Sequence, residues 1–173
     1  DLDADNSSGE SGADYATTFT EDGGPVLAAD GDATLADADN TNLQWLTVRI
    51  TNLLDGAAEG LAADTTGTGI TAAYDPVAGV LTLTGSDSVA NYQQVLRTVT
   101  YNNTSQNPDT TDRSISFVAH DGAASSNVAT VSTAMPIVWV KRSPRRSETR
   151  SATSAWSTLS TTLPTSPRGT VMR

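Results

Sequence analysis

The stretch Leu43-Gln44-Trp45-Leu46-Thr47-Val48-Arg49-Ile50 is the clearest strand in the chain. Every second side chain from Leu46 to Ile50 is apolar, and Thr47 and Arg49 lie between them. A period of two puts apolar and polar side chains on opposite faces of a β-strand. The pattern therefore predicts a strand over residues 43–52 with one face on a hydrophobic core.

A group of oxygen donors stands directly before this strand, in Asp37-Ala38-Asp39-Asn40-Thr41-Asn42. Carboxylate and amide oxygens are the ligands that Ca²⁺ prefers, and a neighbouring strand would hold such a loop in a fixed geometry. Asp and Asn also close ordinary turns through hydrogen bonds to their own backbone. The hexapeptide is therefore interpreted as either a calcium-binding loop or a polar turn.

Other short runs rich in Thr, Val and Ile are separated by turn-forming residues. We expect further strands over residues 14–20, 70–74, 80–84, 98–101, 113–120 and 128–133. We also expect a bulged or short edge strand over residues 26–35 and a Gly/Thr-rich link over residues 55–69. The loop Asp75-Pro76-Val77-Ala78-Gly79 predicts a hairpin between two of these strands. Ser88 is expected to cap a helical turn over residues 89–95. Short strands at this spacing predict an all-β fold, a Greek-key β-sandwich.

The chain divides into two parts of opposite charge. Residues 1–136 contain three arginines and 19 acidic residues, a formal charge of −16, whereas residues 137–173 contain seven basic residues and one acid, a charge of +6. We predict a sandwich domain over 1–136. Residues 137–173 are rich in Ser, Thr, Pro and Arg. We interpret them either as a disordered basic tail or as a segment that does not continue the natural protein, such as an out-of-frame read.

Charge and composition exclude several classes of partner. An acidic domain with so few Lys and Arg side chains argues against nucleic acid, because phosphates are neutralised by those side chains. No apolar run approaches the roughly 20 residues of a membrane span, so no direct membrane insertion is expected. The chain has no cysteine and begins without Met or a signal-peptide pattern. We expect a piece of a longer extracellular protein.

The first residues have part of a calcium motif. Asp1, Asp3 and Asp5 have the one-three-five spacing of a helix-loop-helix calcium loop. That motif requires glycine at its sixth position and an acid at its twelfth, where this chain has Asn6 and Gly12. We therefore reject the motif and keep the three carboxylates as candidate ligands.

Catalytic patterns are weak. His120 stands beside Asp121, but it is the single histidine of the chain and no Gly-x-Ser-x-Gly motif supplies a nucleophile. Paired carboxylates serve glycosidases, whose clefts are usually lined with aromatic residues, and aromatic residues make up only 5% of this chain. We expect no enzyme and assign no catalytic residue.

Three motifs follow one another in an order that resembles a cadherin-like repeat. They are Tyr15-x-x-x-Phe19-x-Glu21, then Asp37-x-Asp39 with Asn42 before a strand, and Phe117-Val118-Ala119-His120-Asp121-Gly122 before Ser125 and Ser126. The segments 90–97 and 112–117 are similar to the tandem cadherin-like repeats of very large bacterial surface proteins. The resemblance covers about residues 10–134.

The resemblance implies a cadherin- or immunoglobulin-like sandwich of seven strands, strung end to end with neighbouring repeats of the same chain. In such proteins calcium is held between neighbours and the repeats serve in adhesion at the cell surface, to a surface protein or a glycan. Carried over by position, the calcium ligands would be Glu21, Asp37, Asp39, Asn42 and Asp121.

The chain departs from the family pattern at two places. Asp112-Arg113 is followed by Ser114 where the family has Glu, and Ala134-Met135-Pro136-Ile137 stands where an Asp-x-Asn-Asp linker is expected. The alternative function is a carbohydrate-binding or accessory sandwich of an extracellular enzyme. Carboxylates that converge at one end of the domain would favour the repeat, and an exposed row of aromatic residues would favour the glycan-binding module.

Overall fold

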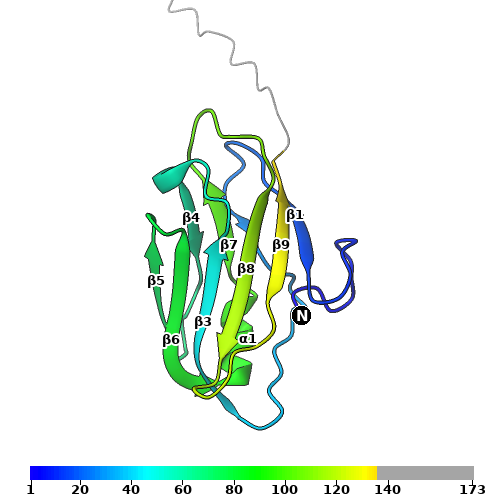
Figure 1. The fold of residues 1–173 in the computed structure, drawn as a ribbon, viewed down its shortest axis with the longest axis vertical. Helices are drawn as coiled ribbons and strands as arrows, with labels where there is room; N and C mark the ends of the chain where they lie inside the picture. The colour runs from blue at the N-terminus through cyan, green and yellow to red at the C-terminus, as the bar shows by residue number, and fades with distance from the viewer. Residues whose placement is uncertain (136–173) are drawn as a thin grey trace, which may run out of the picture. The chain divides into compact units, whose positions relative to one another are not determined.

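Nine strands and two short helices make up residues 1–135, the part of the chain that the computed structural model describes (Figure 1). In chain order they are β1 (Tyr15–Thr18), β2 (Val26–Leu27), β3 (Asn42–Ile50), the 3₁₀ turn η1 (Gly56–Ala58), β4 (Glu59–Ala62), β5 (Thr71–Asp75), β6 (Val80–Ser88), α1 (Val89–Leu96), β7 (Thr100–Asn103), β8 (Arg113–His120) and β9 (Ala129–Ala134). The predicted tail over residues 137–173 lies outside the described residues.

The strands form two sheets, and the predicted all-β sandwich is confirmed. The larger sheet has the order β1-β9-β8-β3-β6-β5 and the smaller one β2-β7-β4. The chain passes between the sheets from β3 to β4, from β6 to β7 and from β7 to β8, as Greek-key connections do. In the larger sheet β3 pairs antiparallel with both β6 and β8, whereas β1 pairs parallel with β9.

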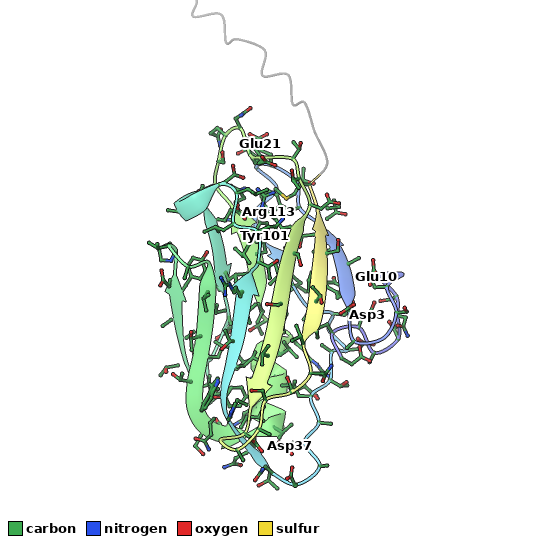
Figure 2. The ribbon with its side chains drawn as sticks, viewed as in Figure 1. Asp3, Glu10, Glu21, Asp37, Tyr101 and Arg113 are labelled. Atoms are coloured by element: carbon green, nitrogen blue, oxygen red, sulfur yellow. The ribbon has the colours of Figure 1, made fainter. Side chains whose placement is uncertain are left out.

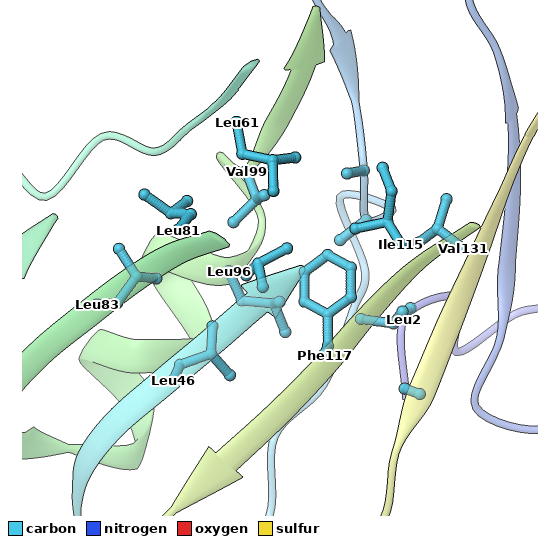
Figure 3. Close-up of a cluster of buried hydrophobic side chains, with 14 of the residues drawn as sticks. Leu2, Leu46, Leu61, Leu81, Leu83, Leu96, Val99, Ile115, Phe117 and Val131 are labelled. Carbon is cyan, nitrogen blue, oxygen red and sulfur yellow. The ribbon is translucent and has the colours of Figure 1, made fainter. Parts of the chain in front are cut away.

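The core lies between the sheets and follows the alternation of the sequence. Leu46, Val48 and Ile50 of β3 are buried, with exposed fractions of 2% or less, as their spacing predicts. Figure 3 shows Leu46 and Phe117 of the larger sheet meeting Leu96 of α1 in one apolar cluster. The order of the strands thus fixes which loops meet at each end of the domain.

Most predicted elements are present. The β5–β6 hairpin, β8 and the helix after Ser88 are confirmed; the Ser88 hydroxyl accepts a hydrogen bond from the Asn91 N–H at 3.1 Å. The short edge strand predicted within residues 26–35 is confirmed as β2 at the edge of the smaller sheet, although it covers only the first two of these residues. The link predicted over residues 55–69 is wrong in part, because it contains β4, which pairs with β7. Within residues 1–135 no helix has the length and apolar character to cross a membrane.

A buried ion pair holds the end of the domain where β8 begins. Arg113 is 1% exposed, and its guanidinium contacts Glu59 at 3.0 Å and Asp55 at 2.7 Å. The hydroxyl of Tyr101 donates a hydrogen bond at 3.0 Å to Glu59 Oε2, the same oxygen that Arg113 Nε contacts. Burial alone would lower the pKa of Arg113, but the carboxylates of Glu59 and Asp55 overcome this effect and raise it.

Candidate metal centre

The start of β3 and the end of β8 bring distant carboxylates together. These strands are antiparallel neighbours, with Trp45 opposite His120. The loop before β3 therefore meets the loop after β8, although the two are about 80 residues apart in the sequence. Carboxylate oxygens of Asp37, Asp39 and Asp121 all lie within 4.8 Å of one another. We call these three residues the Asp37 cluster.

Backbone N–H groups fix two members of the cluster. Asp37 Oδ1 accepts hydrogen bonds from the N–H groups of Asn40 at 3.0 Å and Asp39 at 3.1 Å, which lower the pKa of Asp37. The Asp121 carboxylate accepts hydrogen bonds from the N–H groups of Ala124 at 2.6 Å and Ala123 at 2.7 Å, and these lower its pKa. Both groups are therefore held ionised and in place by the turns they close.

Asp39 behaves differently because it lies against a second carboxylate. Its hydrogen bond to the Asp37 side chain, together with the charge of Asp37, raises the pKa of Asp39. Two carboxyl groups so close favour a shared proton, or a cation in its place. Within residues 1–135 no Lys or Arg side chain forms an ion pair with a carboxylate at this end of the domain. The cluster thus carries negative charge without a Lys or Arg partner.

The predicted ligands do not all come together. Figure 2 labels Asp37 at one end of the domain and Glu21 at the other, so Glu21 does not join the Asp37 cluster. Asn42 is the exposed first residue of β3, paired with Ser88, and within residues 1–135 no hydrogen bond joins it to the cluster. The amide that contacts the cluster is that of Asn40, whose Nδ2 donates a hydrogen bond to Asp121 Oδ2 at 2.5 Å. The sequence offered an amide at both positions and no signal to choose between them.

A second group of carboxylates lies near the N-terminal residues. Asp3, Asp5 and Asp32 each bring one oxygen within 4.8 Å of the others. Asp32 accepts hydrogen bonds from the N–H groups of Ala4 at 3.0 Å and Asp5 at 2.9 Å. Asn6 adopts a φ of 54°, the left-handed conformation that glycine provides at the sixth position of helix-loop-helix calcium loops. Sequence reasoning missed Asp32, which lies 27 residues beyond Asp5.

His120 is held as a polar residue at the end of the sheet. Its Nδ1 accepts a hydrogen bond from the Gly122 N–H at 2.8 Å. Its ring stacks on Trp45, with ring centroids 4.0 Å apart. In a catalytic triad Nδ1–H instead donates to the carboxylate. Here the Gly122 N–H occupies the nitrogen that a triad histidine directs at its carboxylate.

Comparison with known proteins gives one partial relative. No family model matches the chain, and no solved structure matches it. A segment of halomucin from Haloquadratum walsbyi is 37% identical over 93 residues, which cover 50% of this chain and 1% of that protein. The chain therefore spans about a hundredth of the length of this relative. The match relates part of the domain to one segment of a far longer protein.

Proposed function

We propose that residues 1–136 are a calcium-binding, cadherin-like repeat of a secreted or cell-surface adhesin. The observation that carries the proposal is the convergence of Asp37, Asp39 and Asp121 within 4.8 Å, from two loops far apart in the sequence. Ca²⁺ takes six to eight oxygen ligands. Three carboxylates supply part of that shell, and the neighbouring repeat and water supply the rest.

The two ends of the domain have different parts in this proposal. An ion held between successive repeats takes ligands from the trailing end of one repeat and the leading end of the next. Glu21, at the end opposite Asp37, is then available to the next ion along the chain. Calcium bound in this way stiffens each junction, because it offsets the repulsion between acidic groups that face one another. The partners are neighbouring repeats, and the adhesive contact is made elsewhere.

The partial match to halomucin is relevant to where the protein is located. Halomucin is by its name a mucin, so the partial match supports the cell-surface part of the proposal. The glycan-binding alternative receives less support, because Trp45 is the one aromatic residue among the large apolar side chains that are exposed in residues 1–135. We assign no catalytic activity.

The test is thermal unfolding of the protein in chelator, then in about 10 mM calcium, with magnesium as the control ion. Extracellular calcium modules have dissociation constants of about 10⁻⁴ to 10⁻³ M, so linkage predicts a stabilisation of about 1–3 kcal/mol. Asp37→Asn and Asp121→Asn should lose this gain.

Asp75→Asn is the matched control. Asp75 closes the same kind of turn at the β5–β6 hairpin, where its Oδ1 accepts hydrogen bonds from Val77 at 2.8 Å and Ala78 at 3.1 Å. Asp75→Asn should keep the full response to calcium. A response equal for calcium and magnesium, or unchanged in all three variants, would refute the proposed site.

A further inference from the structure

Three segments of the chain match the acceptor sequence for N-linked glycosylation, Asn-x-Ser/Thr. They begin at Asn6, Asn102 and Asn103. Because Ser and Thr are common in this chain, such triplets also arise by chance, and the sequence alone does not choose among them. The structure does, since it places the three acceptors in different surroundings.

The first triplet, Asn6-Ser7-Ser8, lies in an exposed turn. The carbonyl of Asn6 accepts a hydrogen bond from the Gly9 N–H at 3.2 Å, which closes a four-residue turn. Asn6 is exposed, and within residues 1–135 its side chain makes no hydrogen bond. Its Nδ2 atom can therefore form a covalent bond to a sugar without the loss of a contact that stabilises the fold.

The other two acceptors are held by the smaller sheet. Asn103 is 4% exposed, and its Nδ2 donates a hydrogen bond to Asp55 Oδ2 at 2.7 Å, beside the ion pair of Arg113. This nitrogen has no space for a glycan. Asn102 lies in β7, the middle strand of that sheet, opposite Gly60 of β4. Its triplet can enter the cleft of an enzyme only if β7 leaves the sheet.

Hydrogen bonds hold the turn of Asn6 beside the larger sheet. The hydroxyl of Ser8 accepts a hydrogen bond from the Ala16 N–H of β1 at 3.1 Å, and Asp3 Oδ2 accepts one from the Ser8 N–H at 2.8 Å. β1 is an edge strand, and Figure 1 shows the N-terminal loop next to it. A glycan on Asn6 would therefore extend from beside a sheet edge, where a bulky hydrated group hinders pairing with another chain.

We propose that Asn6 is the acceptor of an N-linked glycan. The donor is an oligosaccharide on a lipid pyrophosphate, and the enzyme is an oligosaccharyltransferase. The Nδ2 atom of Asn6 bonds to the anomeric carbon of the first sugar, while the bond from that carbon to the pyrophosphate oxygen breaks. The lipid pyrophosphate leaves and takes up the proton that Nδ2 loses, so no oxidant or reductant is needed.

This inference goes beyond the proposed function. It requires only that the chain meets a glycosylating enzyme on its way to the cell surface. Neither calcium nor a neighbouring repeat takes part in it.

Glycan transfer in vitro tests the inference. The folded full-length chain is incubated with a purified single-subunit oligosaccharyltransferase and its lipid-linked donor, and mass spectrometry of peptides identifies the modified asparagines. Synthetic peptides of residues 1–14 and 98–113 are the unfolded controls, and both should be glycosylated. Asn6 should react about as fast in the folded chain as in its peptide. Asn102 and Asn103 should react at least about tenfold more slowly than in theirs, because a paired strand exposes them only when it opens.

Two results would overturn the proposal. One is an unmodified Asn6 in the folded chain while the peptide of residues 1–14 reacts. The other is a peptide of residues 1–14 that is not accepted while that of residues 98–113 is. Equal rates for Asn102 in the folded chain and in its peptide would refute the selection of Asn6 by the fold.

Three variants locate the acceptor. Asn6→Gly keeps the φ of 54° that this turn requires and should abolish glycosylation of the folded chain. Ser8→Thr keeps the acceptor triplet and should be glycosylated like the native protein, and Asn102→Gln is the matched control that should leave the product unchanged. Glycosylation that persists in Asn6→Gly would refute the site. Glycosylation of Asn6 without calcium stabilisation would reject the proposed function alone, and the reverse result would reject this inference alone.

Discussion

Arg113 is the residue on which one end of the sandwich depends. The alternation of β8 places it on the inward face with Ile115 and Phe117. An inward arginine must find carboxylate partners, because an unpaired buried charge is costly. Glu59 and Asp55 supply them from β4 and the loop before it, so the ion pair links the two sheets.

Arg113→Met should therefore be strongly destabilising. The substitution leaves Glu59 buried without its cation, which costs about 3–5 kcal/mol. Arg49→Met is the matched control, because Arg49 is exposed on the outer face of β3, and a change within about 0.5 kcal/mol is expected there. Urea unfolding of both variants measures the difference. A loss in Arg113→Met no larger than in Arg49→Met would contradict the structural role of the ion pair.

Asp3 should make stability depend on pH in the acid range. Hydrogen bonds from Ser8, and also from the Ser7 N–H, lower the pKa of Asp3 to about 2. A lowered pKa stabilises the fold above the ordinary value near 4, and this contribution is lost as the pH falls toward 2. The advantage of the native protein over Asp3→Asn should therefore shrink between pH 4 and pH 2 in urea unfolding.

The control for Asp3 is Glu10→Gln, which removes one exposed charge from the same loop. The difference in stability between the native protein and Asp3→Asn could stay constant down to pH 2, or Glu10→Gln could show the same pH-dependent difference. Either result would show that the hydrogen bonds of Asp3 do not cause the effect.

At the residue scale, the sequence predicted well which side chains are candidates to bind a cation. It predicted less well which of these side chains lie close together in the fold. Asp37, Asp39 and Asp121 were grouped by the resemblance to a cadherin-like repeat, whereas the periodicity of the sequence placed each of them only beside a strand. Glu21 and Asp32 show the limit: periodicity assigns a face to a side chain, whereas strand order decides which loops share an end. That order depends on pairing between segments far apart in the chain.

Among the elements, α1 shows how well neighbouring residues in the sequence can predict where a helix begins. Ser88 follows an extended stretch and precedes Val89, Tyr92 and Leu96 at helical spacing, and the helix begins where this pattern predicts. The hydroxyl of Ser88 satisfies one of the N–H groups that an isolated helix end leaves free.

Ser88→Ala should accordingly cost about 1 kcal/mol of stability, the usual value for loss of a helix N-cap. Ser132→Ala on the exposed face of β9 should cost less than about 0.5 kcal/mol. Denaturant midpoints compare the two. Equal effects would mean that the hydrogen bond to Asn91 contributes nothing to folding.

Strand β4 shows where local signals fail. Glu59-Gly60-Leu61-Ala62 has no β-branched residue, and its buried acid reads as a loop residue in isolation. The segment becomes a strand because β7 offers a hydrogen-bonding edge and Arg113 neutralises Glu59. Both causes are tertiary, so no window of sequence could have revealed them.

At the scale of the whole molecule, the negative charge of residues 1–136 opposes folding. A formal charge of −16 in one domain produces self-repulsion that salt screens. Stability of the protein in chelator should therefore rise between about 50 mM and 1 M sodium chloride. Chemical unfolding in urea measures it, because urea adds no ions. A midpoint that falls or stays level over this range would show that the charges are already balanced within the fold.

The parallel pairing of β1 with β9 has a consequence for how the domain bears load. The first and last strands of residues 1–135 lie side by side over Tyr15–Thr18 and Val131–Ala134 and run in the same direction. Tension applied at the two ends of the domain pulls these strands past each other along their length. All the hydrogen bonds between them then resist together, in shear, instead of opening one after another as in a zipper. A domain with this strand pairing is therefore expected to unfold only at high force, whether or not a ligand is bound at its acidic end.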